Sequence, residues 1–366
     1  MNKLIKKYLT IALAAVFVFG FSIYGIVAPD KKVSLSERRP HASFPTLNSE
    51  SVFSGKFMSD FETYSLEQFP LRDSFRGIKS YTALNLLGMK DNNGIFLKDG
   101  YIFKTEYPYN AESVERAVRI FRNIHDTFLT DENNVYISVI PDKNCYLPED
   151  SGQLVINYDE LFSVVKDNTD FAQYINIYPL LELEDYYLTD SHWRQENITD
   201  VAQYLLNSMG AGSAFDNYKK IDVESPFYGV YYGQSALKTK ADNISYLTSP
   251  VIDSSKVYDF ETGKYISVYD LEKLNGTDPY EMFLSGSKSI LSIENKQAQT
   301  NKELVIFRDS FGSSIAPLLI NNYSKITLVD IRYIPSSAVT QYISFDNQDV
   351  LFLYSTLVLN NSITLK

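Results

Sequence analysis

The feature that most constrains this chain is an uncharged run near its N-terminus. Residues 8 to 28, YLTIALAAVFVFGFSIYGIVA, contain no charged side chain over 21 positions. A helix of about 20 such residues spans the ~30 Å hydrocarbon core of a bilayer. The preceding MNKLIKK carries three lysines, which favour a cytoplasmic N-terminus under the positive-inside rule. We therefore expect a single-pass anchor at 8–28, with residues 1–7 in the cytoplasm and the main domain outside a bacterial cell membrane.

A cleaved signal peptide is the alternative interpretation of this run. Signal peptides have shorter apolar segments, roughly 7–15 residues long, that end in a small-residue cleavage site. Here the segment is longer, and its last small-residue pair, Val27-Ala28, is followed by Pro29. A proline at that position disfavours cleavage, so the sequence favours an uncleaved anchor.

Composition limits the partners and cofactors of the remaining 338 residues. The net charge is -11, and -14 without the three N-terminal lysines, which argues against nucleic acid or an anionic lipid surface. Cys145 is the only cysteine, so an intrachain disulfide is impossible. Three scattered histidines provide no metal-ligand spacing, and no glycine-rich phosphate loop is present. We expect no metal and no cofactor.

Apolar spacing predicts an α/β protein. Residues 29–90 are interpreted as a connector and N-terminal helices, with two helices between residues 51 and 87 that are separated at Pro70. Residues 91–366 begin with a predicted hairpin at 94–104 and then alternate helices with strands, which implies a mainly parallel sheet covered by helices. A Tyr-, Gly- and Ser-rich stretch at about 225–290 is interpreted as an irregular or β-rich insertion. The predicted helices are 111–129, 157–165, 194–209 and 313–322, and the predicted strands are 134–141, 176–181, 303–307, 325–334 and 349–360.

A serine follows the predicted strand 303–307, within the segment RDSFG. Sites in open α/β sheets form at the carboxyl ends of strands. The start of the next helix offers backbone N–H groups and a positive dipole to a developing oxyanion, and Gly312 allows close backbone approach. Ser310 is therefore a candidate nucleophile. Helix capping by Asp309 or Ser310 explains the same residues equally well.

The segment DSHW, residues 190 to 193, is the second candidate element. A serine nucleophile needs a general base, and the base needs a group that orients it. His192 can supply the base and Asp190 the orienting carboxylate. The alternative is that Asp190 or Ser191 only caps the helix that follows.

Taken together, these segments resemble the DHHW proteins of Firmicutes and, through them, the SGNH-like domains of alginate O-acetylation proteins. The resemblance implies an SGNH-hydrolase-like α/β fold and a site in which Asp190 orients His192 and His192 activates Ser310. One departure is that Ser191 stands where the family name implies a first histidine, while His192 and Trp193 are kept. The resemblance covers nearly all of the predicted exterior part and is carried by ERRPHASFP (37–45), QFPLRDSF (68–75), PDK (141–143), TDSHW (189–193), FYGVYYG (227–233), PYEMFLSG (279–286), RDSFGSSIAPLL (308–319) and VDIRYI (329–334).

Some of the other site candidates also have a purely structural interpretation. Gly286, within Ser285-Gly286-Ser287, could offer an oxyanion donor by analogy with SGNH enzymes, or it could form a plain turn. Arg332 could bind a carboxylate or a sugar, or it could form a structural salt bridge. Trp193 is a further candidate beside His192. Tyr228 and its neighbours Tyr231 and Tyr232 could stack on sugar faces.

The expected function is a membrane-anchored O-acyltransferase, with acetyl as the expected group. It would act on a cell-surface or secreted polysaccharide through an acyl-serine intermediate. By resemblance, a multi-pass membrane acyltransferase supplies the acyl group. The alternatives are a carbohydrate esterase with the same three residues and a non-catalytic polysaccharide-binding or assembly protein.

Overall fold

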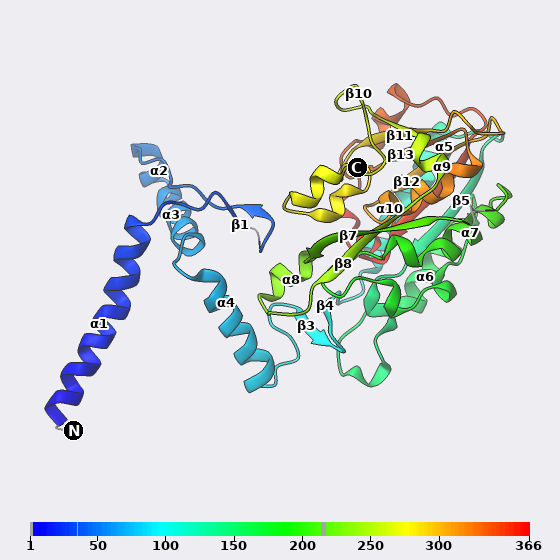
Figure 1. Ribbon diagram of the computed structural model, residues 1–366. Helices are drawn as coiled ribbons and strands as arrows, with labels where there is room; N and C mark the ends of the chain where they lie inside the picture. Colours follow the sequence, from blue (N-terminus) through cyan, green and yellow to red (C-terminus); the bar gives the residue numbers. More distant parts are fainter. Residues whose placement is uncertain (1–2, 35, 214–216) are drawn as a thin grey trace. The chain divides into compact units, whose positions relative to one another are not determined.

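The computed structural model describes residues 3–34, 36–213 and 217–366, so residues 1–2 of the expected cytoplasmic tail lie outside the described part (Figure 1). The chain forms two compact units. The first comprises residues 1–92 and 232–238, and the second comprises 93–231 and 239–366. The first unit therefore includes a short piece of the predicted 225–290 insertion.

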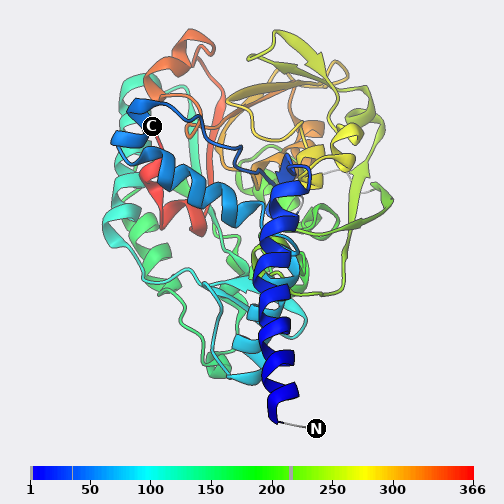
Figure 2. The same ribbon diagram turned by 90° about the vertical axis from the view of Figure 1, so that its left-hand side faces the viewer.

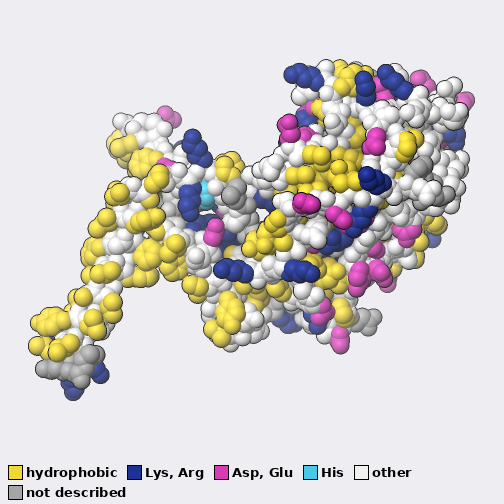
Figure 3. All heavy atoms as spheres, in the orientation of Figure 1, with side chains coloured by type: hydrophobic (Ala, Val, Ile, Leu, Met, Phe, Trp, Pro, Cys, Tyr) yellow, Lys and Arg dark blue, Asp and Glu magenta, His cyan; other side chains and the backbone are white. Residues whose placement is uncertain are grey.

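The first unit is mainly helical. Its N-terminal helix is the one described helix that is long and apolar enough to cross a bilayer, and apolar side chains cover it (Figure 3). Where two helices were expected after the connector, the structure has three. Gly55, with a left-handed φ of 77°, separates the first two, and Pro70 lies between the second and the third. The elements are α1 (Lys3–Val27), β1 (Val33–Ser34), β2 (Arg39–Pro40), α2 (Ser49–Phe53), α3 (Lys56–Glu67), α4 (Arg72–Tyr81) and a π-helical turn (Thr82–Leu86).

The second unit is built on an eight-stranded sheet, and the predicted mainly parallel α/β fold is confirmed. Five neighbouring strands, β13, β12, β14, β5 and β6, run parallel, and β11, β9 and β10 extend one edge in antiparallel pairing. In sheet order the strands are β10 (Lys264–Ile266), β9 (Lys256–Asp259), β11 (Ile290–Glu294), β13 (Lys325–Val329), β12 (Glu303–Arg308), β14 (Asp349–Ser355), β5 (Asn134–Ile140) and β6 (Gln173–Tyr174).

Helices cover both faces of this sheet (Figures 1 and 2). Alternate residues of the central strands point to opposite faces: Leu304 and Ile306 pack into one core, and Val305 and Phe307 into the other. Two-sided burial explains why these strands are continuously apolar. The first core includes α7 (Thr199–Ser208) and α10 (Gly312–Leu319), and the second includes α5 (Ala111–Phe128), α6 (Tyr158–Asp167) and α11 (Thr356–Leu359).

Several predicted elements differ from the structure. The predicted strand 349–360 ends at Ser355 and its last residues form α11, and the predicted strand 325–334 ends at Val329. The predicted strand 176–181 is wrong: the pairing segment is β6, and Tyr178–Leu180 forms a 3-10 turn, where Pro179 lacks the N–H that a ladder needs. The 225–290 stretch contains strands, as the β-rich interpretation expected, and two of them, β9 and β10, join the main sheet. The same stretch contains α8 (Val230–Ser235), α9 (Pro250–Ser254) and β8 (Asp242–Thr248), and β8 pairs with β7 (Lys219–Phe227). The predicted hairpin at 94–104 is confirmed as β3 (Ile95–Lys98) and β4 (Tyr101–Lys104).

Phe352 offers a test of the second core. Its ring is fully buried and lies 5.0 Å from the Phe121 ring and 4.9 Å from the Phe307 ring. We predict that Phe352→Ala lowers the free energy of unfolding by about 3–5 kcal/mol. Urea unfolding followed through Trp193, the only tryptophan, measures this loss. Phe53→Ala is the control because Phe53 is 91% exposed, and a Phe352→Ala loss below about 1 kcal/mol would contradict the packing.

Candidate active site

Ser310 lies in the loop that joins β12 to α10, at the carboxyl end of a central parallel strand. The helix begins after Phe311, which occupies the capping position without a side-chain capping bond. The capping alternative holds for Asp309, because its carboxylate accepts the N–H of Phe311 at the start of the helix. The same carboxylate accepts bonds from the N–H and hydroxyl of Ser355. It ties the serine loop to the end of β14.

The structure brings Ser310 and His192 together although they are 118 residues apart in sequence. His192 Nε2 lies 2.8 Å from Ser310 Oγ, and His192 Nδ1 lies 2.6 Å from Asp190 Oδ1. The next helical segments begin without any cap from Asp190 or Ser191, because Arg194 and Ile198 occupy the capping positions. The arrangement has the geometry in which a carboxylate orients an imidazole and the imidazole accepts a serine proton.

The Asp190 carboxylate is almost completely buried, with 1% of the residue exposed. Oδ1 also accepts the N–H of His192, and Oδ2 accepts the N–H of Val230. Gly229 makes this approach possible, since a Cβ at that position would lie 2.3 Å from the Cβ of Asp190. Close packing against Asp190 therefore explains Gly229, the first glycine of FYGVYYG. The sequence alone did not reveal this contact.

Three residues behind the imidazole hold its position, and two of them were not expected. The Tyr280 ring stacks on the His192 ring, with centroids 3.8 Å apart and planes within 10° of parallel. Trp193 donates its indole N–H to Ser314 Oγ, and Tyr280 donates its hydroxyl to the same oxygen. Ser314 in α10 therefore links the histidine segment to the helix that follows Ser310.

Another unexpected residue near the base is Lys143, of the PDK segment. It is 2% exposed, and its Nζ donates to the backbone carbonyls of Tyr187, Leu188 and Asp190. A buried amino group that bonds to three carbonyls of one loop fixes the course of that loop. Nothing in the local sequence signals this role, because lysine is seldom buried.

A small pocket of about 170 Å³ opens beside Ser310. Arg332 lines it, but its guanidinium also forms a bidentate salt bridge with Asp330, at 2.9 and 2.6 Å. Both interpretations of Arg332 are therefore compatible with its position. The described residues that line the pocket are His192, Asp278, Tyr280, Glu281, Phe283, Gly286, Ser287, Ser310, Ser313, Arg332 and Tyr333.

Four expected contact residues have other roles or positions. The N–H of Gly312 donates to Asp309 and that of Gly286 to Phe283, so both expected oxyanion amides are already engaged. Gly312 instead lies against Arg308, since a Cβ there would be 2.7 Å from that side chain. Trp193 is fully buried and cannot touch a substrate in the pocket. Tyr228 is 39% exposed, and it is not among the described residues that line this pocket.

Left-handed backbone occurs beside the pocket, as it does at several other places in the described chain. Leu284 and Ser285 adopt left-handed φ angles of 56° and 57°, followed by Gly286 at 83°. Left-handed backbone in residues other than glycine costs on the order of 1–3 kcal/mol and gathers at functional sites. At Gly286 a side chain is also excluded, because a Cβ would meet the Glu281 side chain at 2.7 Å.

Comparison with known proteins gives a match over the part of the chain that contains the site. The model of the family described as DHHW protein matches residues 161–329, a span that includes Asp190, His192 and Ser310. The family resemblance is confirmed. A comparison with curated proteins finds no match.

Solved structures resemble this chain in fold. A DHHW family protein from Eubacterium siraeum has a TM-score of 0.61 at 21% identity and aligns over 74% of this chain and 93% of its own. Bacillus cereus PatB1 with a sulfonyl adduct has a TM-score of 0.58 at 20% identity, over 72% of this chain and 95% of its own. The O-acetyltransferase domain of Pseudomonas putida AlgJ gives 0.46 at 12% identity, over 74% and 93%. The likeness of the first two shows the predicted SGNH-like α/β fold.

Lys143 gives a pH-dependent test of the loop behind the base. Burial lowers the pKa of Lys143 to about 7, against the opposing charges of Asp190, Asp242 and Asp142. Between pH 7 and 9 the unfolded chain, with an ordinary lysine pKa, holds a proton that the folded chain releases, so this lysine's contribution to stability rises with pH. Relative to Lys143→Met, the wild type should gain on the order of 2 kcal/mol over that range in urea unfolding. A stability difference that stays constant with pH would contradict this burial.

Proposed function

We propose that this protein is an O-acyltransferase of the cell envelope that transfers an acetyl group to a polysaccharide hydroxyl. The observation that carries the proposal is the continuous chain of short contacts from Asp190 through His192 to Ser310. A serine hydroxyl at neutral pH needs such a base before it can attack a carbonyl. The match to the DHHW family model covers residues 161–329, which include all three residues, and it supports the proposal.

The proposed reaction has two proton-balanced halves. Ser310 Oγ attacks the carbonyl carbon of the acyl donor while His192 Nε2 takes the hydroxyl proton, and Asp190 stabilises the resulting imidazolium. The leaving group takes that proton from His192, and acyl-Ser310 remains. A sugar hydroxyl then attacks the ester and gives its proton to His192, which returns it to Ser310 as the acylated sugar leaves.

The size of the pocket supports acetyl as the transferred group. At about 170 Å³ it is smaller than the roughly 300–1,000 Å³ of pockets for drug-sized ligands. A long acyl chain would need a longer cavity than the pocket beside Ser310 provides. Arg332 at the pocket wall offers a cation to an anionic part of the donor or acceptor.

The helix α1 supports a membrane-anchored protein with its main domain outside the cell. It is 25 residues long and carries its lysines at the N-terminal end. An extracytoplasmic transferase needs an acyl donor that crosses the membrane, and a multi-pass membrane acyltransferase is the proposed supplier.

Turnover of p-nitrophenyl acetate by the full-length protein tests the three-residue site. We predict that Ser310→Ala and His192→Ala each lose at least ~10²-fold in the rate of nitrophenol release, because nucleophile and base act as one unit. Ser254→Ala and His125→Ala are matched controls, since both residues lie outside the pocket. These controls should retain wild-type rates.

The acceptor separates the proposed transferase from its two alternatives. If oligosaccharides become acetylated and nitrophenol release accelerates when they are added, the transferase proposal stands. If the wild type turns over and only acetate forms, the protein is an esterase. If folded wild type and variants all match the uncatalysed rate, a non-catalytic polysaccharide-binding protein replaces the proposal.

A further inference from the structure

We propose that the turn between α3 and α4 inserts into the outer leaflet of the membrane beside the anchor. The surface in question, the α3–α4 corner, comprises residues 66–78 and lies entirely in the first unit. This inference rests on the proposed membrane span of α1. It adds a second membrane contact that does not depend on the catalytic proposal.

The first argument is contact between the corner and the membrane helix itself. The Phe21 ring of α1 stacks on Phe69 at 5.6 Å and meets Phe75 edge-on at 5.7 Å. One turn further along α1, a Cβ at Gly25 would lie 3.7 Å from the ring of Pro70. The corner therefore packs along the last turns of α1 and not beyond its end.

Depth follows from this contact. Phe21 lies six residues before Val27, the last residue of α1, and a helix rises about 1.5 Å per residue, which places the contact roughly 9 Å inside the helix end. Interfacial helices bury their apolar faces about 5–10 Å into the boundary between headgroups and acyl chains. If α1 spans the bilayer up to its end, Phe69 and Phe75 must lie at that depth.

The second argument is the exposed apolar stripe on the corner. Phe75 and Ile78 lie at helical spacing on one face of α4 and are 36% and 62% exposed. Leu71, just before the helix, is 63% exposed. Leu66 and Phe69, just before them, are 62% and 40% exposed. Apolar side chains gathered at this density in water mark an interaction surface.

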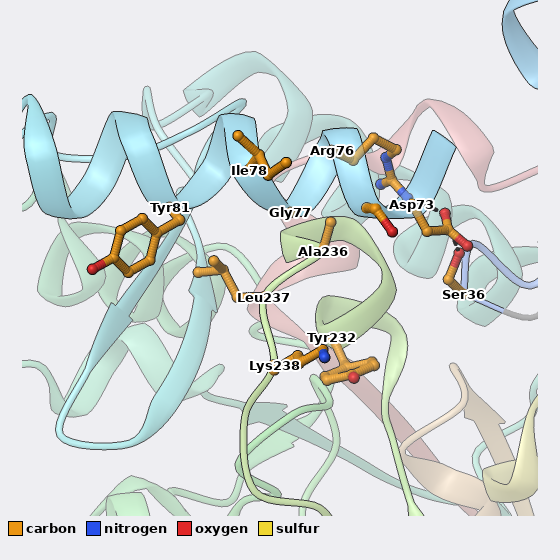
Figure 4. A pocket seen from close by; sticks show the side chains of 11 residues that line it. Ser36, Asp73, Arg76, Gly77, Ile78, Tyr81, Tyr232, Ala236, Leu237 and Lys238 are labelled. Carbon is orange, nitrogen blue, oxygen red and sulfur yellow. Dashed lines mark hydrogen bonds and ion pairs between the residues drawn. The ribbon is translucent and has the colours of Figure 1, made fainter. Parts of the chain in front are cut away.

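The other faces of α4 are held by the first unit itself. Arg72 and Arg76 form ion pairs with Glu37 at 2.9 and 3.3 Å, and Arg76 also donates to the carbonyl of Gly233. Figure 4 shows Arg76 and Gly77 beside the segment 232–238, where a Cβ on Gly77 would lie 2.9 Å from the Ala236 carbonyl. Thus the charged side of α4 is satisfied within the protein, and the apolar stripe is the side left for a partner.

A groove between α1 and the corner has apolar walls and a polar end, the arrangement that a lipid with its acyl chain and headgroup needs. It measures about 720 Å³ and is lined by apolar residues of α1 and the corner, with Asp30, Lys31 and Gln68 at its polar end. A lipid acyl chain fits the apolar walls, and a headgroup fits the polar end. Because the protein is net negative, insertion of the stripe, not charge attraction, would carry the contact.

Site-directed spin labelling of the full-length protein in phosphatidylcholine nanodiscs tests this insertion. The background carries Cys145→Ala, and single labels are placed by Ile78→Cys on the stripe, Asp73→Cys on another face of α4, and Val16→Cys in α1. Collision rates with oxygen, which partitions into lipid, and with a water-soluble nickel complex report depth. We expect the oxygen-to-nickel ratio at positions 78 and 16 to exceed that at 73 several-fold, in low and in high salt.

Each other outcome overturns the proposal in a distinguishable way. A ratio at position 78 equal to that at 73, with position 16 in lipid, would show that α1 is an anchor but the corner stays in water. A ratio at 78 that collapses in high salt would show charge-driven adsorption without insertion. If position 16 is also accessible to nickel, the membrane span itself fails, while the turnover assay still decides the catalytic proposal.

Discussion

The structure of the site depends on a buried carboxylate that cannot remain unpaired. A carboxylate removed from water is tolerated only when hydrogen bonds or cations compensate the lost hydration. Asp190 meets this condition with donors from two segments: the backbone and ring of His192, and the N–H of Val230. The same bonds that permit its burial fix the tautomer and direction of the imidazole toward Ser310.

Other buried, hydrogen-bonded aspartates around the site join its separate loops in the same way. Asp242 accepts the N–H groups of Leu188 and Thr189 and a side-chain bond from Arg194. Asp309 joins the serine loop to the end of β14, and Asp142 accepts Tyr158 and Thr356 hydroxyls at the end of β5. These carboxylates are each at most 3% exposed, and each joins segments far apart in sequence. Because the parallel strands deliver these loops to one edge, hydrogen bonding between loops can assemble a rigid site.

Much of the fold followed from pattern alone, and the failures have physical causes. Apolar runs flanked by turn residues identified β5, β12 and β14, because burial on both faces leaves little freedom in composition. The short strand β6 and the 3-10 turn at Pro179 carry too few residues for periodicity to separate them. The strands β9 and β10 were not located individually, because strands of three or four residues with lysines and exposed tyrosine resemble loops.

Within the site, motif reasoning reached the residues whose chemistry is distinctive. A serine after a strand and a histidine two residues after an aspartate could be named as Ser310, His192 and Asp190. Tyr280 and Lys143 could not, since stacking on an imidazole and bonding to a loop's carbonyls depend on tertiary contacts. The expected roles of Trp193 and Gly312 failed for the same reason: packing, and not chemistry, explains both.

Covalent trapping tests the central claim most directly. Sulfonyl fluorides react with serine hydroxyls that a neighbouring base activates, and peptide mass spectrometry locates the adduct. The account predicts one adduct, on Ser310, in the full-length protein, and its loss in His192→Ala while that variant remains folded. Modification of another serine, or equal modification of Ser310 without His192, would contradict the claim that these residues act together.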